Sequence, residues 1–236
     1  MSNMQNKYFE ERLKQHAGES ARVVPFVPSD KLLLMDFTER NTELTDEILN
    51  DTNKFIKYIN AKLKEAGAKY GIGGYDEHRT VYSRSKVFDT PGGGEPRRLH
   101  LGTDIWGSPY TKVLAPLNGI VHSFAFNNAF GDYGATIILT HNLDGESFHT
   151  LYGHLSLNSI KNIQEGDVVY KGDVIAEFGI PFENGQWPPH LHFQIIKDMQ
   201  GMKGDYPGVC ALSEKEAYLT NCPDADFILN MIQYAK

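Results

Sequence analysis

Two short segments of the chain carry imidazoles and a carboxylate at spacings that suit metal chemistry. His190 and His192 are separated by one residue, so in an extended strand both side chains point to the same face. His100 and Asp104 have the same parity and share a face if their segment is also extended. Three imidazoles and one carboxylate form a donor set that suits Zn²⁺, which binds histidine nitrogen and carboxylate oxygen.

More histidines are present than one metal ion needs. A catalytic zinc site uses three protein ligands and leaves the fourth position to water, whose pKa falls to about 7. Histidines beyond the three ligands are then free for proton transfer or for stabilising an oxyanion. His154 lies between the two segments and adds a further imidazole. The remaining histidines are predicted to be structural or solvated: His16, His78, His122, His141 and His149.

Five motifs occur in the order seen in lysostaphin-type (LytM-type) zinc metalloendopeptidases, and the chain resembles that family over about residues 97–197. The motifs are His-Leu-Gly-Thr-Asp at 100–104, Ala-Pro-Leu-Asn-Gly-Ile-Val at 115–121, Thr-Leu-Tyr-Gly-His-Leu-Ser at 150–156, a glycine-aspartate run at 166–175, and His-Leu-His-Phe at 190–193. The resemblance implies that His100, Asp104 and His192 bind zinc. It also implies that His154 deprotonates or orients the attacking water and that His190 steadies charge on the substrate carbonyl oxygen.

The chain departs from the family pattern at several places. Family members commonly carry Glu where this chain has Gln194, and Asn where it has Ala135. Residues 183–189 replace an approach of small residues, and their two prolines and Trp187 predict a narrower groove beside the metal. Residues 133–194 are also similar to the metallopeptidase-like domain of some large intracellular proteins that contain kinase-like and aminotransferase-like domains.

Short apolar runs that alternate with turn signals predict an antiparallel, mainly β fold between residues 98 and 197. The resemblance sharpens this expectation to a two-sheet, lysostaphin-like domain of the duplicated hybrid motif type. Helices are predicted within residues 7–15, over residues 45–63, and in two short stretches at 213–219 and 226–234.

We therefore expect residues 1–70 to form a helical N-terminal extension and residues 71–236 to form the metallopeptidase domain with a helical tail. The extension either docks against the catalytic domain or roofs the groove and restricts the size of the substrate.

Residues 72–96 are rich in glycine and polar residues and are predicted to form a loop. Arg79 and Tyr82 lie in this loop just before the first metal motif, and together with Trp187 they are candidate substrate-binding residues. A guanidinium can hold a carboxylate through two hydrogen bonds, which makes Arg79 the first of these to test. The alternative is that these loop residues are simply solvated.

Composition limits the partners of the chain. A formal net charge of −7 argues against nucleic-acid or anionic-membrane partners, which require a basic face. The start of the sequence has no apolar run of signal-peptide length, and no stretch is apolar enough to span a membrane. A cytoplasmic location is expected, or export if a leader precedes the sequence. The two cysteines, Cys210 and Cys222, are expected to be free thiols.

These observations favour a zinc-dependent hydrolase that cleaves a peptide or amide bond. The substrate is either a peptidoglycan-type peptide or a small intracellular peptide or amide. The alternative is a non-catalytic module on the same β scaffold that binds a metal or ligand and acts as a partner activator or carrier. The sequence leaves the oligomeric state open.

Overall fold

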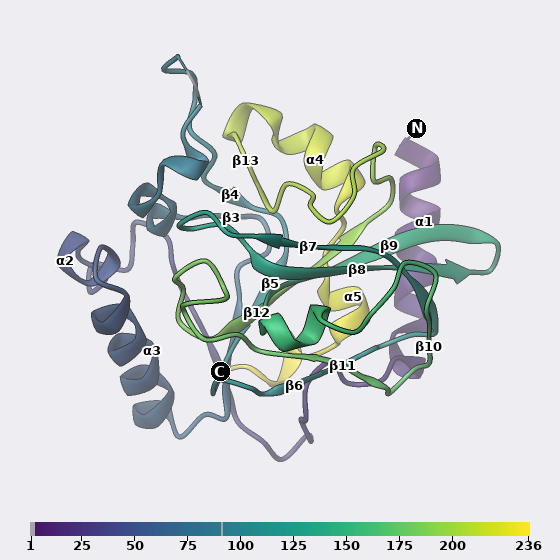
Figure 1. Cartoon of the computed structure of the whole chain (residues 1–236), viewed down its shortest axis with the longest axis horizontal. Coiled ribbons are helices and arrows are strands. Elements are labelled where there is room, and N and C mark those ends of the chain that lie inside the picture. Colours follow the sequence, from purple (N-terminus) through teal and green to yellow (C-terminus); the bar gives the residue numbers. More distant parts are fainter. Residues whose placement is uncertain (1–2, 91) are drawn as a thin grey trace.

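The computed structural model describes residues 3–90 and 92–236, and its strands form one large sheet and two small ones (Figure 1). The eight-stranded sheet has the order β1-β2-β5-β12-β9-β8-β7-β10. Its strands are β1 Leu32–Leu34, β2 Tyr70–Gly73, β5 Thr103–Trp106, β12 His190–Ile196, β9 Glu146–Leu155, β8 Gly134–Leu143, β7 Gly119–Asn127 and β10 Val168–Val169. One small sheet pairs β11 (Val174–Glu177) with β6 (Lys112–Leu114), and the other has the order β13 (Val209–Cys210), β4 (Leu99–His100) and β3 (Glu77–His78).

Strand β12 lies in the middle of the large sheet and is buried along its whole length. Leu191, Phe193 and Ile195 are fully buried in the apolar core on one face. His190 and His192 occupy the alternate positions and face the other side, as the period of two predicts. The mainly β fold expected from the sequence is confirmed.

The parallel pairing of β1 with β2 was not anticipated. Parallel strands need a long crossover connection, and here helices α2 (Asp46–Leu49) and α3 (Thr52–Ala66) provide it. The single helix predicted over residues 45–63 is thus two helices. They separate at Asp51, whose carboxylate caps α3 by accepting hydrogen bonds from the backbone N–H groups of Asn53 and Lys54. Gly67 ends α3 with a φ of 60°, a left-handed conformation that glycine adopts readily.

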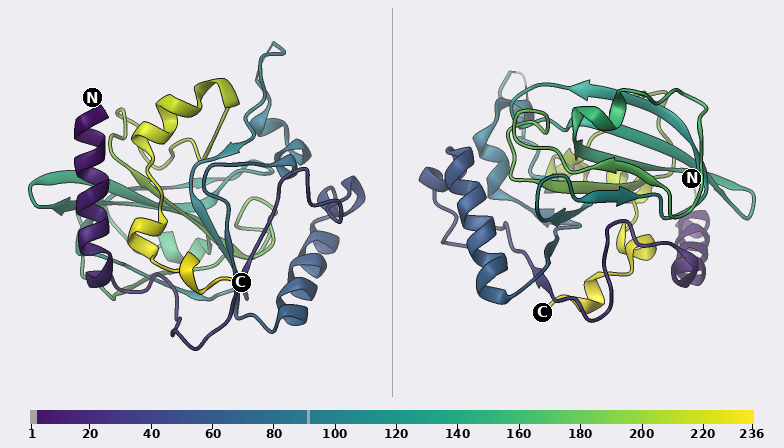
Figure 2. Two further views of the ribbon diagram at one scale, coloured as in Figure 1. Left: turned by 180° about the vertical axis from the view of Figure 1, so that it is seen from behind. Right: turned by 60° about the horizontal axis from the view of Figure 1, so that its bottom comes forward.

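The N-terminal helix lies on the opposite side of the molecule from α3 (Figure 2). Helix α1 (Asn3–His16) contacts α5 (Asp226–Leu229), and α4 (Lys215–Asn221) follows β13. Short 3₁₀ helices complete the chain: η1 Ala17–Glu19, η2 Thr80–Arg84, η3 Lys86–Phe88, η4 Leu157–Ile160, η5 Leu212–Glu214 and η6 Ile232–Tyr234. The helices expected near both ends of the sequence are therefore present.

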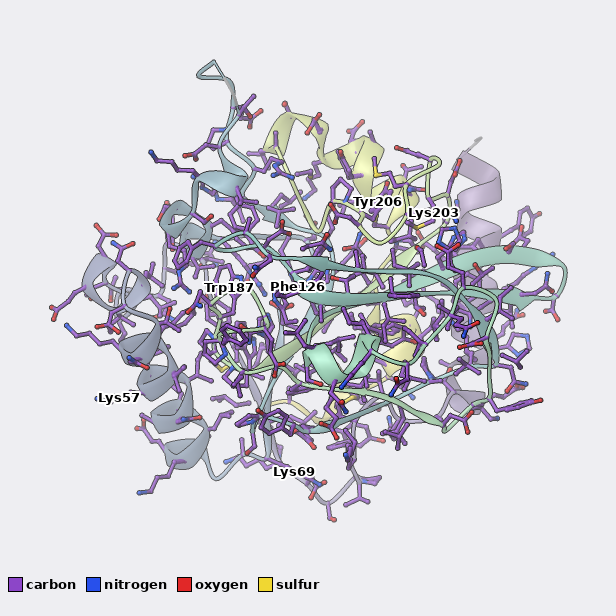
Figure 3. The ribbon with its side chains drawn as sticks, viewed as in Figure 1. Lys57, Lys69, Phe126, Trp187, Lys203 and Tyr206 are labelled. Carbon is purple, nitrogen blue, oxygen red and sulfur yellow. The ribbon has the colours of Figure 1, made fainter. Side chains whose placement is uncertain are left out.

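A second apolar cluster joins the N-terminal segment to the rest of the chain. Phe55 of α3 is fully buried, and its ring centroid lies 6.1 Å from that of Trp106 and 6.3 Å from that of Trp187. In Figure 3, Trp187 lies between α3 and the strands. The division at residue 70 stays a prediction, but α3, β1 and β2 share both a core and a sheet with the later residues.

Two further features bear on the sequence predictions. Cys210 and Cys222 are buried free thiols, as expected. Among the described residues, no helix combines the length and apolarity needed to cross a membrane.

The prediction that residues 72–96 form a loop is wrong for residues 77–88, which form β3, η2 and η3. The alternative that Arg79 and Tyr82 are solvated is wrong as well, whereas residues 89–90 and 92–96 are exposed (Figure 1). Arg79 is 2% exposed and Tyr82 is 6% exposed. Polar composition misled the prediction because these polar groups are bonded inside the protein instead of to water.

We expect the Phe55→Ala variant to lower the free energy of unfolding by about 3–5 kcal/mol, because a fully buried aromatic ring is removed. Chemical denaturation monitored by fluorescence and circular dichroism should show one shared transition. The control is Lys57→Ala on the exposed side of α3 (Figure 3), which should change stability by less than about 0.5 kcal/mol. Separate transitions for the two probes would show that residues 1–70 unfold independently.

Candidate metal centre

The candidate ligands meet because β12 is inserted between β5 and β9. His192 lies directly opposite Asp104 on β5 and opposite Gly153 on β9. His154 follows Gly153 in sequence, while His190 is two residues before His192 on β12. His100 ends β4 in a different sheet, so a turn at residues 101–102, rather than one continuous strand, brings it to Asp104.

Three acceptor atoms converge at this point. His100 Nε2 is 2.9 Å from His192 Nδ1 and 3.3 Å from Asp104 Oδ1, and His192 Nδ1 is 3.2 Å from the same oxygen. Ligands bound tetrahedrally at about 2.0–2.1 Å are separated by about 3.3 Å, which matches this triangle. The donor set and its spacing therefore fit a zinc ion.

The hydrogen bonds of the two histidines determine which nitrogen faces the centre. His100 Nδ1 donates to the carbonyl oxygen of Gly74 at 2.8 Å, which leaves Nε2 unprotonated. His192 Nε2 donates to Gln194 Oε1 at 2.9 Å, which leaves Nδ1 unprotonated. Two lone pairs and a carboxylate oxygen thus face one another, and only a cation relieves the resulting repulsion.

Gln194 explains one departure from the family pattern. Besides accepting from His192, its side-chain amide donates to Pro207 O at 3.1 Å and to Cys222 Sγ at 3.2 Å. A glutamate could accept from His192 but could not make the other two hydrogen bonds. The sequence identified this position as unusual without revealing its role in orienting His192.

Arg79 holds the second oxygen of Asp104. Its Nη1 is 2.5 Å from Asp104 Oδ2, and its Nε is 2.6 Å from Glu77 Oε2. Burial opposes ionisation of Asp104, but interactions with His100 and Arg79 outweigh it and hold its pKa well below the usual range. Because Oδ2 is occupied, Oδ1 is the oxygen turned toward the two histidines.

The remaining donors of Arg79 are also engaged within the protein. Nη1 lies 3.3 Å from the Tyr82 hydroxyl and Nη2 lies 3.4 Å from Gly73 O. A Cβ at Gly74 would lie 1.6 Å from Arg79 Nη2, so only glycine leaves room for the guanidinium. The contacts of Arg79 are therefore with protein acceptors, and its binding of a substrate carboxylate stays a prediction.

His154 and His190 form a stacked pair beside the ligands. Their ring centroids are 4.1 Å apart, and His190 also stacks on Trp106 at 3.9 Å. Each Nδ1 donates to a backbone oxygen at 2.8 Å, that of Asn184 for His154 and that of Pro188 for His190. Nε2 of each ring is thus the unprotonated nitrogen.

Burial keeps this histidine pair neutral. It lowers the pKa of His190 to about 4 and holds the pKa of His154 well below its usual value, with His190 adding to the effect on His154. The backbone at His154 has a φ of 62°, a left-handed conformation that costs of the order of 1 kcal/mol in a non-glycine residue. Both rings are therefore bases at neutral pH, and one is held in a strained position.

A pocket of about 180 Å³ surrounds the centre. All five proposed ligand and catalytic residues line it, and so do Arg79, Tyr82 and Trp187. The structure thus brings every predicted site residue to one cavity. The substrate-binding roles of Arg79, Tyr82 and Trp187 stay predictions. Sequence reasoning assigned no role to Gly74, Asn184 and Tyr133, which contact these residues through hydrogen bonds or packing.

The other histidines lie away from the pocket lining. His141 is buried and bonds the carbonyl oxygen of Asn118 at 2.8 Å and Thr150 Oγ1 at 2.7 Å, so its role is structural, as expected. In the turn that follows, Asn142 Oδ1 accepts a hydrogen bond from Gly145 N.

Comparison with known proteins gives matches to peptidases, in line with the family resemblance of the sequence. Residues 98–204 match the model described as peptidase family M23. The L-Ala--D-Glu endopeptidase of Bacillus subtilis (strain 168) is 29% identical over 164 residues, which cover 65% of this chain and 46% of that protein. An uncharacterized metalloprotease of Haemophilus influenzae is 36% identical over 99 residues, which cover 42% of this chain and 18% of the relative. The chain thus spans less than half the length of these relatives.

Among the solved structures to which this chain is similar is the antimicrobial peptidase lysostaphin from Staphylococcus simulans. It is 26% identical with a TM-score of 0.43, and the match covers 71% of this chain and 52% of lysostaphin.

We expect Arg79→Gln to weaken zinc binding by about 10–100-fold, because the carboxylate of Asp104 loses the group that orients it. Arg79→Lys keeps the charge without the planar fork and should fall between Gln and the native residue. Zinc affinity would be measured by competition with a chromophoric chelator. Arg22→Lys, outside the pocket, is the control and should bind zinc normally. Unchanged affinity in Arg79→Gln would contradict this role.

The metal-free protein should lose stability on acidification. Burial lowers the pKa of His100 to about 3 and those of His141 and His190 to about 4, while the unfolded chain has histidine pKa values near 6.5. The unfolded state therefore binds more protons below pH 6.5, and stability falls from there to about pH 4. Each histidine contributes a slope of about 1.4 kcal/mol per pH unit.

Urea denaturation between pH 7.5 and 4.5 measures this effect. His141→Gln should reduce the slope by the contribution of one histidine, whereas the exposed Asn60→Gln, which changes no titratable group, should leave it unchanged. A free energy of unfolding that stays constant from pH 7 to 5 would rule out the linkage.

Proposed function

We propose that the protein is a zinc-dependent peptidase that cleaves a peptide or amide bond with an activated water, and the match of residues 98–204 to peptidase family M23 supports this proposal. The observation that carries the proposal is the triangle of unprotonated donor atoms from His100, Asp104 and His192. Beside it lie two further neutral imidazoles that no ligand set of three requires.

The metal would supply Lewis acidity: Zn²⁺ lowers the pKa of water to about 7 and polarises a substrate carbonyl. Three protein ligands leave room for water and substrate. Gly74 O and Gln194 Oε1 hold the two histidine ligands in their binding tautomers, while Arg79 orients the carboxylate.

His154 is the proposed base. Its Nε2 is unprotonated because Nδ1 donates to Asn184 O, so Nε2 takes a proton from the attacking water. His190 has the same tautomer, with Nδ1 donating to Pro188 O. When protonated at Nε2, His190 would donate from that nitrogen to a developing oxyanion.

A peptide substrate is supported by the named activity of the Bacillus subtilis relative, an L-Ala--D-Glu endopeptidase. The alternative of a non-catalytic activator or carrier would leave the His154–His190 pair without a purpose. A stacked pair of buried imidazoles with unprotonated Nε2 atoms supports proton transfer instead.

Measuring both zinc content and hydrolysis rate should distinguish the metal-ligand residues from the catalytic residues. Asp104→Ala should lose both bound zinc, measured by elemental analysis, and hydrolysis of a panel of wall-derived and short peptides. His154→Ala should keep stoichiometric zinc while its hydrolysis rate falls by about 10²–10⁴-fold, because only the base is removed. His78→Ala, at an exposed position, is the control for both readouts.

A chelator should abolish hydrolysis, and added zinc should restore it. Turnover that survives the chelator, or full zinc content in Asp104→Ala, would defeat the proposed mechanism.

A further inference from the structure

Trp106 covers one face of the His190 imidazole. The two residues lie directly opposite each other on the neighbouring strands β5 and β12. Their ring centroids are 3.9 Å apart and the ring planes are inclined by 12°, so the rings are stacked. Stacked aromatic rings attract each other more strongly than their buried area alone would provide. The indole therefore restrains rotation of the imidazole about its side-chain bonds.

The other face of His190 is occupied by His154. The centroids of these two rings are 4.1 Å apart and their planes are inclined by 29°. His154 belongs to β9 and Trp106 to β5, and these strands flank β12 on its two sides, so the imidazole of His190 is held between them. Trp187 meets His190 edge-on at 6.4 Å instead. A stack of three rings thus sets the plane of His190.

The N-terminal segment packs against the same indole. Phe37 is 1% exposed, and its ring centroid lies 5.1 Å from that of Trp106. Phe55 of α3 lies 6.1 Å from Trp106 and is fully buried. Trp106 is itself 2% exposed although it lines the pocket. Because protein interiors are closely packed, the indole has little freedom to move away from His190.

The proposed chemistry requires His190 in one orientation. Its Nδ1 donates to Pro188 O at 2.8 Å, so Nε2 is the nitrogen left for a substrate. A single hydrogen bond still allows the ring to tilt about the axis of that bond, whereas flat contacts on both faces prevent the tilt. Displacing a catalytic group by about 1 Å can cost about 10²-fold in rate.

We propose that Trp106 is a positioning residue that holds the plane of His190 through this stack, and that the N-terminal segment contributes to the site through Phe37. The inference rests on the proposed peptidase function and adds to it a residue outside the five ligand and catalytic positions. Phe37 acts on the chemistry from within the apolar core, through the indole that it contacts.

Nuclear magnetic resonance tests the stack without relying on turnover. In the zinc-loaded native protein, the indole ring current should move the ring-proton resonances of His190 upfield of those of the exposed His78. A spectrum of His190→Gln assigns them. The resonances should move downfield in Trp106→Leu and part of the way in Phe37→Leu.

Two outcomes of this measurement would overturn the role of Trp106. One is a native spectrum in which the resonances of His190 and His78 coincide, and the other is a set of His190 resonances that stays in place in Trp106→Leu. Resonances that move in Trp106→Leu but not in Phe37→Leu would overturn the contribution of the N-terminal segment.

Hydrolysis kinetics supply the second test. Trp106→Leu should keep stoichiometric zinc and lower kcat by about 10–100-fold with KM changed less than about threefold, because it disturbs a catalytic group and no binding contact. Trp106→Phe keeps a flat ring and loses no hydrogen bond, since the indole N–H has no partner among the described residues. It should recover kcat to within about threefold of the native value. Full activity in Trp106→Leu, or equal losses in the two variants, would overturn the inference.

A matched control separates positioning from a general loss of stability. Phe148→Leu removes a fully buried aromatic ring from a part of the core that does not line the pocket. At a temperature where all variants stay folded, its kcat should lie within about twofold of the native value. An equal loss of kcat in Phe148→Leu and Trp106→Leu would overturn the role of the stack.

The two proposals fail in different ways. If the native protein cleaves no peptide while the His190 resonances respond to Trp106→Leu, the proposed function fails and the positioning of His190 stands. If the native protein is an active zinc peptidase and neither the resonances nor kcat respond to Trp106→Leu, the positioning role fails alone.

Discussion

The architecture of the site depends on a buried carboxylate shared between a guanidinium and two imidazoles. Asp104 gives one oxygen to Arg79 and the other to the space between His100 and His192. A buried ion pair of this kind is expensive to desolvate and contributes little net stability. Its value is geometric, because it determines which oxygen faces the centre. Gly74 leaves room for the guanidinium of Arg79, and Glu77 holds it through an ion pair.

Hydrogen bonds and burial set the orientation and protonation of the imidazoles. Each of the four in the pocket donates one N–H to a fixed acceptor, three times a backbone oxygen and once an amide side chain. Gln194 lies on β12, whereas Gly74, Asn184 and Pro188 lie in loops or turns beside the strands, so the sheet and its adjoining loops together set the protonation pattern. Burial then keeps His100, His154 and His190 neutral. Hydrogen bonding and desolvation thus leave one nitrogen of each ring unprotonated without the help of a bound metal or substrate.

The spacing of His190 and His192 predicted their common face, and the order of the motifs predicted the family and the mainly β fold. These features are local, so sequence patterns report them. The role of Arg79 was not accessible in this way, because its contact with Asp104 joins positions 25 residues apart through a turn that looked solvated. The break at Asp51 escaped notice for a related reason: apolar spacing continued across it while a side-chain cap interrupted the backbone. The contacts of Gln194 depend on the tertiary path of the chain near Pro207 and Cys222.

The order of strands also determines when the site is assembled. β12 separates β5 from β9, yet both neighbours precede it in the sequence. During synthesis from the N-terminus, the sheet consists of two unjoined halves until residues 190–196 emerge, and contacts between distant segments are slow to form. A chain synthesised only as far as residue 189 consequently lacks His190 and His192, so the same insertion that joins the two halves of the sheet also completes the candidate metal centre.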